Sequence, residues 1–412
     1  MTNKQVVGLG LAGAASLMLA GCTCVSGGFS DDVAFMKEHT PIILLKDGDA
    51  AVAVAPDYQG RVMTSTFDRK AGPSFGWINR PVIEKGLLSD EEKKGKLEEH
   101  IYVFGGEERF WLGPEGGQFA LYFKPGDKFE FSDWRTPAVI DTEPFEVVST
   151  SKDRAVFRRD CELTNFSGTV FKMGIERTVR LLDEAATAET IGIDLPEGIR
   201  MVAFETDNRL TNTGEKPWVP ETGLPSIWML GMLNPAPKTT IVIPFKAGPE
   251  AELGPKVNDA YFGKVPPEYL KVEEDILFFK GDGTRRGKIG IGPKRTKGVA
   301  GSYDADSQVL TVVTYNMQDA PYGYVNSMWE HQKEPYSGDV INSYNDGSPE
   351  PGAAPLGPFY EIETSSPAAA LKPGETMKHV QRTMHFQGSE ADLDGIALKV
   401  FGVDLETIKS KF

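Results

Sequence analysis

Alternation of apolar and polar residues is the feature that most constrains this chain, because it recurs along almost the whole of its 412 residues. Successive side chains of a β-strand point to opposite faces, so a period of two predicts strands with one buried face. More than ten such runs occur, among them AVAVA, FKMGIERTVRL, TIVIPF, FYEIETS and MKHVQRTMHF. Turn clusters rich in glycine and proline, such as LPEG, NTGEKP and KPGE, separate the runs.

The order of these runs predicts the fold class. Strand follows strand without the intervening helices of a βαβ protein, which indicates an all-β antiparallel sandwich or barrel of unusual size. No repeat of fixed period is present, which argues against a propeller. Short helices are expected up to about His39, near residue 90 and from Ser389, where Ser389 and Asp404 are suited to be N-caps. No linker is visible between 40 and 388, so residues 37–412 are predicted to form one domain.

One stretch, GGEERFWLGPEGGQFALYF at 105–123, combines two acids, a guanidinium and an indole with a glycine-rich loop. We expect its second half, GGQFALYF, to be a strand. The first half, EERFWLGPE, is then a loop at a strand edge, where Arg109 can bind a carboxylate or hydroxyls and Trp111 can stack on a ring. In the alternative, Arg109 pairs with Glu107 and Trp111 packs on the core.

Composition excludes several classes of partner. The formal net charge of −15 argues against nucleic acid, whose phosphates require a basic surface. The chain has no dinucleotide fingerprint, no His-Glu-x-x-His and no Cys-x-x-Cys motif. We therefore expect no cofactor, no transition metal and no nucleic-acid partner, and leave a loose calcium site open.

The N-terminus carries a targeting signal. MTNKQVVGLGLAGAASLMLAGC has one cation and an apolar run too short and too rich in small residues for a comfortable spanning helix. Its ending, Leu-Ala-Gly-Cys, resembles the bacterial lipobox, which implies a signal peptide over 1–21, lipid on Cys22 and a tether over 22–36. The lipid would hold the protein on a membrane of the cell envelope, the outer membrane or a periplasm-facing surface in a Gram-negative cell. An ordinary signal peptide is the alternative.

The C-terminal strands carry the candidate chemistry. On a strand, Glu361 and Glu363 share one face, roughly 6.5 to 7 Å apart by strand rise. If that face is enclosed, repulsion and desolvation raise the pKa of one carboxyl, as a general acid or base requires. The next strand places polar residues on one face, which predicts either a wet exterior or the lining of a cleft: His379, Gln381, Thr383 and His385.

This region resembles the C-terminal part of the galactose mutarotases, or aldose 1-epimerases. The shared features are Glu363-Thr364, a proline-containing stretch, the turn LKPGE at 371–375 and a closing strand that ends in His385-Phe386. The resemblance covers about thirty residues closely. It implies a large antiparallel β-supersandwich with short helices at its ends, a carbohydrate ligand and, for Glu363, the role of catalytic base at the anomeric hydroxyl.

The general acid that the family resemblance implies has no counterpart in this sequence. Mutarotases carry that histidine in an Asn-His-x-Tyr-Phe-type motif, which is absent here. His331 has the richest polar and aromatic surroundings and is our candidate for the acid, with His385 and His379 as alternatives. A structural role is the other reading of a lone histidine.

Three functions remain open at this stage. The first is a lipoprotein that epimerises or isomerises a sugar, with Glu363 as base and His331 as acid. The missing histidine motif favours the second, a non-catalytic carbohydrate-binding lipoprotein, and the third is a structural envelope protein. The first two predict contacts with the sugar from Arg109, Trp111, Glu361, Trp329 and His385.

Overall fold

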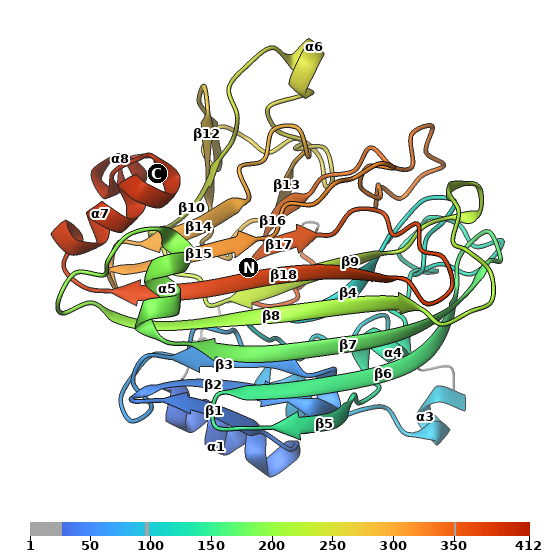
Figure 1. The fold of residues 1–412 in the computed structure, drawn as a ribbon, viewed down its shortest axis with the longest axis horizontal. Helices are drawn as coiled ribbons and strands as arrows, with labels where there is room; N and C mark the ends of the chain where they lie inside the picture. Colours follow the sequence, from blue (N-terminus) through green and yellow to red (C-terminus); the bar gives the residue numbers. More distant parts are fainter. Residues whose placement is uncertain (1–26, 95–98, 350–351) are drawn as a thin grey trace, which may run out of the picture.

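The computed structural model describes residues 27–94, 99–349 and 352–412, in which eighteen strands form three antiparallel sheets (Figure 1). The largest sheet has ten strands in the order β11-β12-β10-β14-β15-β18-β8-β7-β6-β5. Its strands are β5 (Glu146–Thr150), β6 (Arg154–Thr164), β7 (Val170–Leu182), β8 (Arg200–Asn212), β10 (Thr239–Pro244), β11 (Leu270–Val272), β12 (Ile276–Lys280), β14 (Val299–Asp304), β15 (Val309–Tyr315) and β18 (Thr376–Gln387).

A five-stranded sheet in the order β13-β16-β17-β9-β4 lies against the ten-stranded sheet. Its strands are β4 (Arg109–Gly113), β9 (Ser226–Leu233), β13 (Gly287–Ile291), β16 (Ile341–Asn345) and β17 (Tyr360–Ser365). Alternation gives its two faces different chemistry. Ile289, Ile341 and Ile362 point into the core between the sheets, with Ile241 and Val313 of the larger sheet. The predicted all-β antiparallel supersandwich is confirmed.

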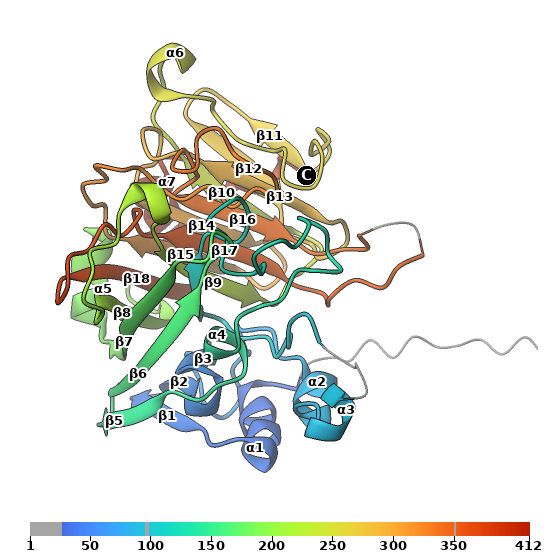
Figure 2. The same ribbon diagram turned by 90° about the vertical axis from the view of Figure 1, so that its right-hand side faces the viewer.

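The third sheet forms a separate layer at the N-terminal end. It contains β1 (Ile43–Asp47), β2 (Ala50–Ala55) and β3 (Arg61–Thr66), and Figure 2 shows it with α1 below the larger sheets. The helices are short: α1 (Phe29–His39), α2 (Arg80–Lys85), α3 (Asp90–Lys94), α4 (Ala138–Asp141), α5 (Glu184–Ile191), α6 (Glu250–Leu253), α7 (Glu390–Phe401) and α8 (Leu405–Lys409), with 3-10 turns at Pro56–Tyr58 and Pro220–Thr222.

Both predicted C-terminal caps are present. Ser389 Oγ accepts a hydrogen bond from the N–H of Asp392 at the start of α7, and Asp404 accepts one from Thr407 at the start of α8. Each bond satisfies a backbone donor that has no partner within the helix. Leu393 and Ile396 of α7 then pack on the ten-stranded sheet.

The folded body begins inside the segment 22–36 that was predicted to be a tether. Helix α1 starts at Phe29, and Phe29, Val33 and Met36 are buried against the three-stranded sheet. Apolar side chains at a spacing of three to four residues form one helix face, so this segment packs instead of extending. The predicted signal peptide and Cys22 lie outside the described residues. None of the helices that are described is long and apolar enough to cross a membrane.

The sequence prediction for 105–123 reversed strand and loop. Arg109–Gly113 is a strand, β4, which pairs with β9 through Arg109↔Leu230 and Trp111↔Trp228. The expected strand GGQFALYF is irregular, because Gly117 has a φ of +85° and the Leu121 N–H bonds back to the Pro114 carbonyl at 3.0 Å. Residues 120–123 of this segment are nevertheless buried in the core, although they pair with no strand.

A buried polar layer joins the sheets. His379, Gln381 and Thr383 of β18 are at most 1% exposed, so this face is neither the wet exterior nor the cleft lining predicted for it. Its centre is the ion pair of Arg177 Nη2 with Glu108 Oε1 at 2.9 Å, both side chains being 0% exposed. Polar groups this deep require partners, and the sandwich supplies them across its layers.

We expect Arg177→Ala to lower the free energy of unfolding by about 3–5 kcal/mol, because it leaves the Glu108 carboxylate buried and unpaired. Arg158→Ala, on the neighbouring strand, removes a largely exposed arginine and should change stability by less than about 0.5 kcal/mol. Urea unfolding measures both. Equal midpoints for the two variants would contradict a central role for this pair.

Candidate functional site

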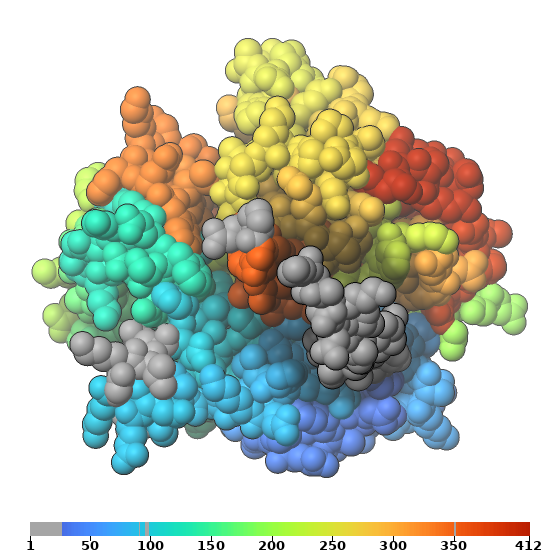
Figure 3. Space-filling model, turned by 180° about the vertical axis from the view of Figure 1, so that it is seen from behind, coloured from blue at the N-terminus to red at the C-terminus, as the bar shows by residue number. Residues whose placement is uncertain are grey.

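A cavity of about 730 Å³ lies on the face of the five-stranded sheet that points away from the core. Trp228, Lys288, Asn342 and Ser365 of four strands form its floor, and Ser226 and Gly113 continue it toward β4. Loop residues within 115–131, 261–262, 325–330, 346–349 and 354–356 line its sides. Figure 3 shows these segments, in teal, yellow, orange and orange-red, meeting on one face of the molecule.

Strand register places the candidate base at this floor. Glu363 pairs with Asn342 on one side and Leu230 on the other, and Ser365 follows two residues later on the same face. Both Asn342 and Ser365 line the cavity. Glu363 therefore lies in the polar face of β17, between residues that form the cavity floor.

Two lining residues hold the Glu363 carboxylate. Its Oε2 accepts hydrogen bonds from Trp228 Nε1 at 3.0 Å and from Lys288 Nζ at 2.9 Å. The side chain is 1% exposed, and its Oε1 has no hydrogen-bond partner among the described residues. Burial disfavours the Lys288 ammonium, but the carboxylates of Glu363 and Glu115 outweigh it and raise the pKa of Lys288. The arrangement leaves one carboxylate oxygen free to accept a proton.

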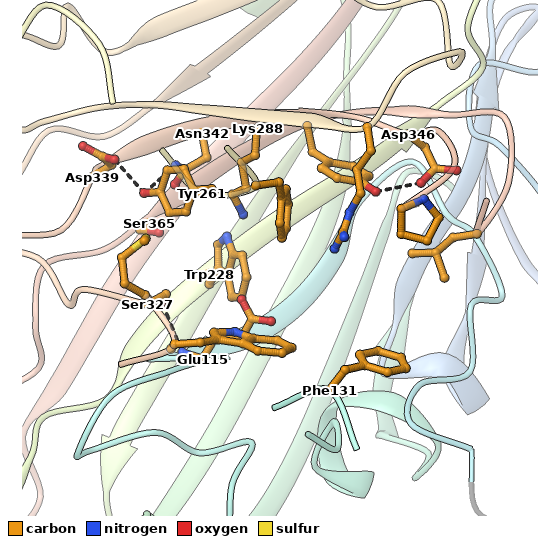
Figure 4. A pocket seen from close by; sticks show the side chains of 18 of the residues that line it. Glu115, Phe131, Trp228, Tyr261, Lys288, Ser327, Asp339, Asn342, Asp346 and Ser365 are labelled. Carbon is orange, nitrogen blue, oxygen red and sulfur yellow. Dashed lines mark hydrogen bonds between the residues drawn. The ribbon is translucent and has the colours of Figure 1, made fainter. Parts of the chain in front are cut away.

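A second carboxyl, Glu115, comes from the loop after β4 and lines the cavity itself. Its main-chain N–H donates to Ser327 Oγ at 3.1 Å, and Figure 4 shows its side chain directed toward Trp228 and Lys288. Burial raises the pKa of Glu115 to about 7; Lys288 opposes the shift and Glu363 adds to it. A carboxyl with this pKa exists in both protonation states near neutral pH, as a general acid or base requires.

The side of the cavity near β13 and β16 offers an ordered polar cluster. Tyr261 donates its hydroxyl proton to Asp339 Oδ2 at 2.6 Å, and Asn342 Nδ2 donates to the Tyr261 oxygen at 3.0 Å. Asn258 Nδ2 also donates to Asp339, at 3.0 Å, while burial raises the pKa of Asp339. Within the described part of the chain, no group of three or more His, Cys, Asp or Glu is placed to hold a metal ion.

Arg109 and Trp111, both predicted at the site, lie on the cavity side of the five-stranded sheet next to Leu230 and Trp228, but they are buried and do not line the cavity. Arg109 forms a buried ion pair with Glu361 at 2.5 Å, and not with Glu107 as the alternative had it. Burial raises the pKa of Glu361 to about 7 although Arg109 opposes the shift. Trp111 is 4% exposed and packs edge-to-face on Trp228, with ring centroids 5.6 Å apart. Trp111 thus supports the floor rather than a ligand.

Of the remaining candidates, Trp329 lines the cavity and the two histidines do not. His331 is exposed and packs edge-on against Phe129, 5.3 Å between centroids. The structure does not bring His331 to Glu363. His385 lies between the sheets, where Nε2 contacts Glu107 Oε1 at 2.8 Å, and it borders a separate hollow of about 520 Å³.

Sequence reasoning missed Glu115, Lys288 and Tyr261. Glu115 lies in GPEGG, within the stretch 105–123 that was considered a candidate binding loop. Nothing in the sequence around a single acid between glycines indicates that its side chain is buried. Lys288 and Tyr261 come from segments without any local motif. Strand register and loop packing bring Lys288 and Tyr261 to the cavity, and neither can be known before the fold is known.

A family model described as a family of unknown function (DUF6786) matches residues 27–412 of the chain. No curated protein matches the sequence.

Solved structures of the galactose mutarotase type are similar to the chain. One is a candidate aldose 1-epimerase of Escherichia coli, which is 12% identical in sequence, with 84% of this chain and 98% of that chain covered and a TM-score of 0.47. Another is a galactose mutarotase-like protein of Lactobacillus casei, which is 11% identical, with 84% of this chain and 100% of that chain covered and a TM-score of 0.46. A protein of Synechocystis sp. is also similar, with 14% sequence identity, 85% of this chain and 96% of that chain covered, and a TM-score of 0.48. The resemblance predicted from the sequence agrees with these matches, which concern the fold and not the activity.

We expect the Glu115 carboxyl to titrate at about pH 7, against the 4.5 typical of glutamate. Lys288→Met should raise this pKa further, because it removes the cation that favours the charged form, and Glu363→Gln should lower it. Carbon-13 NMR of glutamate-labelled protein measures the titration, and Glu115→Gln identifies the signal. Titration near 4.5, a lowered pKa in Lys288→Met or a raised pKa in Glu363→Gln would contradict this electrostatic coupling.

Proposed function

The chain therefore belongs to this family of unknown function, and we propose that it binds a carbohydrate in the cavity and isomerises it by acid–base chemistry. The observation that carries the proposal is a pair of neighbouring carboxyls: Glu115 lines the cavity, and Glu363 is bonded to two residues of its floor, Trp228 and Lys288. Glu363 has one free oxygen, and Glu115 has a pKa of about 7. Such a pair supplies a base and an acid at the same pH.

The cavity wall supports a sugar as the ligand. A volume of about 730 Å³ falls within the usual range for small-molecule sites. Rings of Trp228, Tyr261 and Trp329 offer faces for the C–H surface of a sugar. Asp339, Asn342 and Lys288 offer hydrogen-bond partners for its hydroxyls.

We infer an epimerisation at the anomeric carbon as the reaction. Glu363 takes the proton of the anomeric hydroxyl, the ring C–O bond breaks, and Glu115 gives its proton to the ring oxygen. The open-chain aldehyde rotates and closes on its other face, while the two protons return by the reverse steps. Glu115 replaces His331 in the role of acid, because it lines the cavity and His331 does not.

A non-catalytic binder is the second candidate, and one observation favours it. Glu363 is 1% exposed, and its Oε2 is held by both Lys288 and Trp228. An ion pair of this kind can stabilise the floor of a binding site without taking part in proton transfer. Binding without turnover would distinguish this function from the first.

We further propose that the protein is a cell-envelope lipoprotein anchored through Cys22. Support comes from the sequence: a short apolar run ends in Leu-Ala-Gly-Cys, and the folded body begins only a few residues later, at α1. Two or more acyl chains on one residue give stable membrane attachment.

We expect Glu363→Gln to lower turnover about 10²–10⁴-fold while binding persists, because the amide cannot accept the proton. NMR magnetisation transfer between anomers, across a panel of free sugars, measures turnover. Glu334→Gln, an exposed residue outside the cavity lining, is the matched control and should be unaffected. Full turnover in Glu363→Gln would exclude the role of base.

The pH profile tests Glu115. Because the acid must be protonated, the rate should fall as pH rises through about 7. Glu115→Gln should lower the rate at pH 6 and abolish this alkaline limb. A limb that survives in the variant belongs to another group and would remove Glu115 from the mechanism.

The anchor is tested in cells. We expect the full chain, expressed in Escherichia coli, to incorporate an alkyne-labelled fatty acid and to partition into detergent. Cys22→Ser should do neither. A mature N-terminus without lipid on Cys22 would contradict the proposed anchor.

A further inference from the structure

A second hollow adjoins the cavity. It has a volume of about 290 Å³ and is bordered by α2, residues 99–103 and two residues that also line the main cavity, Phe131 and Leu356. Phe131 is 59% and Leu356 49% exposed, which is unusual for large apolar side chains. The two hollows therefore meet at these two exposed apolar side chains, and we call the two hollows with their junction the path.

We propose that this path binds an oligosaccharide, with its reducing-end sugar in the main cavity and at least one further sugar over Phe131 and Leu356. The inference rests on the proposed function, because it places the anomeric hydroxyl of the chain end at Glu363. It adds the substrate class: a sugar chain, not a free monosaccharide.

The direction of the chain follows from the closed floor. The five-stranded sheet closes one end of the cavity, where Trp228 and Lys288 hold Glu363. A sugar beside Glu363 cannot extend through the sheet, so any further sugars must extend outward. Only a reducing-end sugar has the free anomeric hydroxyl that this chemistry needs.

Aromatic rings continue along the path. Trp329 in the main cavity stacks on Trp134 (centroids 5.9 Å apart, planes at 23°), and Phe131 stacks on Trp134 (6.0 Å, 18°). His100 in the second hollow stacks on Phe131 (4.3 Å, 25°). This packing fixes the Phe131 ring while leaving much of it exposed, so it forms a rigid apolar surface for a sugar ring.

Polar groups border the second hollow, as a hydroxylated ligand requires. Lys85 and Glu99 form an exposed ion pair at 2.8 Å, and Asn79 and Tyr102 stand on neighbouring walls. An apolar platform between polar edges matches a pyranose, which has an apolar face and hydroxyls around its rim. A purely apolar ligand would cover the charged Lys85 and Glu99 side chains without offering either a hydrogen bond in place of water.

Calorimetry with matched sugars tests the inference. The probes are glucose, galactose, mannose, xylose and N-acetylglucosamine, each compared with its own disaccharide and trisaccharide. For the sugar that binds, we expect the disaccharide to bind about tenfold more tightly than the monosaccharide. In Phe131→Ala, Leu356→Ala and the double variant this gain, measured against the monosaccharide affinity of the same variant, should fall to about twofold or less.

Met317→Ala is the control, since it removes an equally exposed apolar side chain that lines neither hollow. Circular dichroism confirms folding of each variant. If the monosaccharide binds as tightly as its oligomers, or if the gain survives the double variant, the oligosaccharide inference fails and the proposed function stands. If no sugar in the panel binds, the proposed function fails and the inference with it.

Discussion

The ion pair between Arg177 and Glu108 is the constraint on which the three sheets depend. Arg177 lies in the ten-stranded sheet, Glu108 directly precedes β4 of the five-stranded sheet, and Arg177 Nε also donates to the carbonyl of Gly60, beside β3, at 2.9 Å. The neighbouring Glu107 repeats the pattern, accepting bonds from Ser65 of β3 and His385 of β18. Because charges buried this deeply need fixed partners, the pairs set how the layers align.

The same alignment gives the cavity its floor. Arg109 follows the two connecting acids and pairs with Glu361, which fixes β4 relative to β17 although β9 separates them. Trp111 packs edge-to-face against Trp228, its neighbour on the adjacent strand, and Trp228 donates a hydrogen bond to Glu363. The stretch with two acids, a guanidinium and an indole is thus a structural connection between the core and the site, and each of its polar residues has a partner far away in sequence.

Local pattern was sufficient to predict the strands, the C-terminal caps and the β-sandwich, because side-chain alternation and capping depend on residues close in sequence. The local pattern gave a wrong prediction at 105–123, because the apolar residues of a glycine-rich loop alternate as they would in a strand. The site was only partly predictable. Glu363 could be found from its motif, whereas Glu115 becomes a candidate acid through burial beside Lys288, 173 positions away in the printed sequence. His331 misled because a polar, aromatic neighbourhood in sequence does not reveal on which surface a loop lies.

The position of β18 has a consequence for synthesis. This strand lies between β15 and β8, and it joins the β5–β8 half of the ten-stranded sheet to the half that contains β10 and β15. Its residues, 376–387, are made after both halves. A nascent chain that stops before them exposes two long strand edges, which are templates for pairing between molecules. A chaperone that shields β8 and β15 during translation would therefore protect the step at which this fold is most exposed to aggregation.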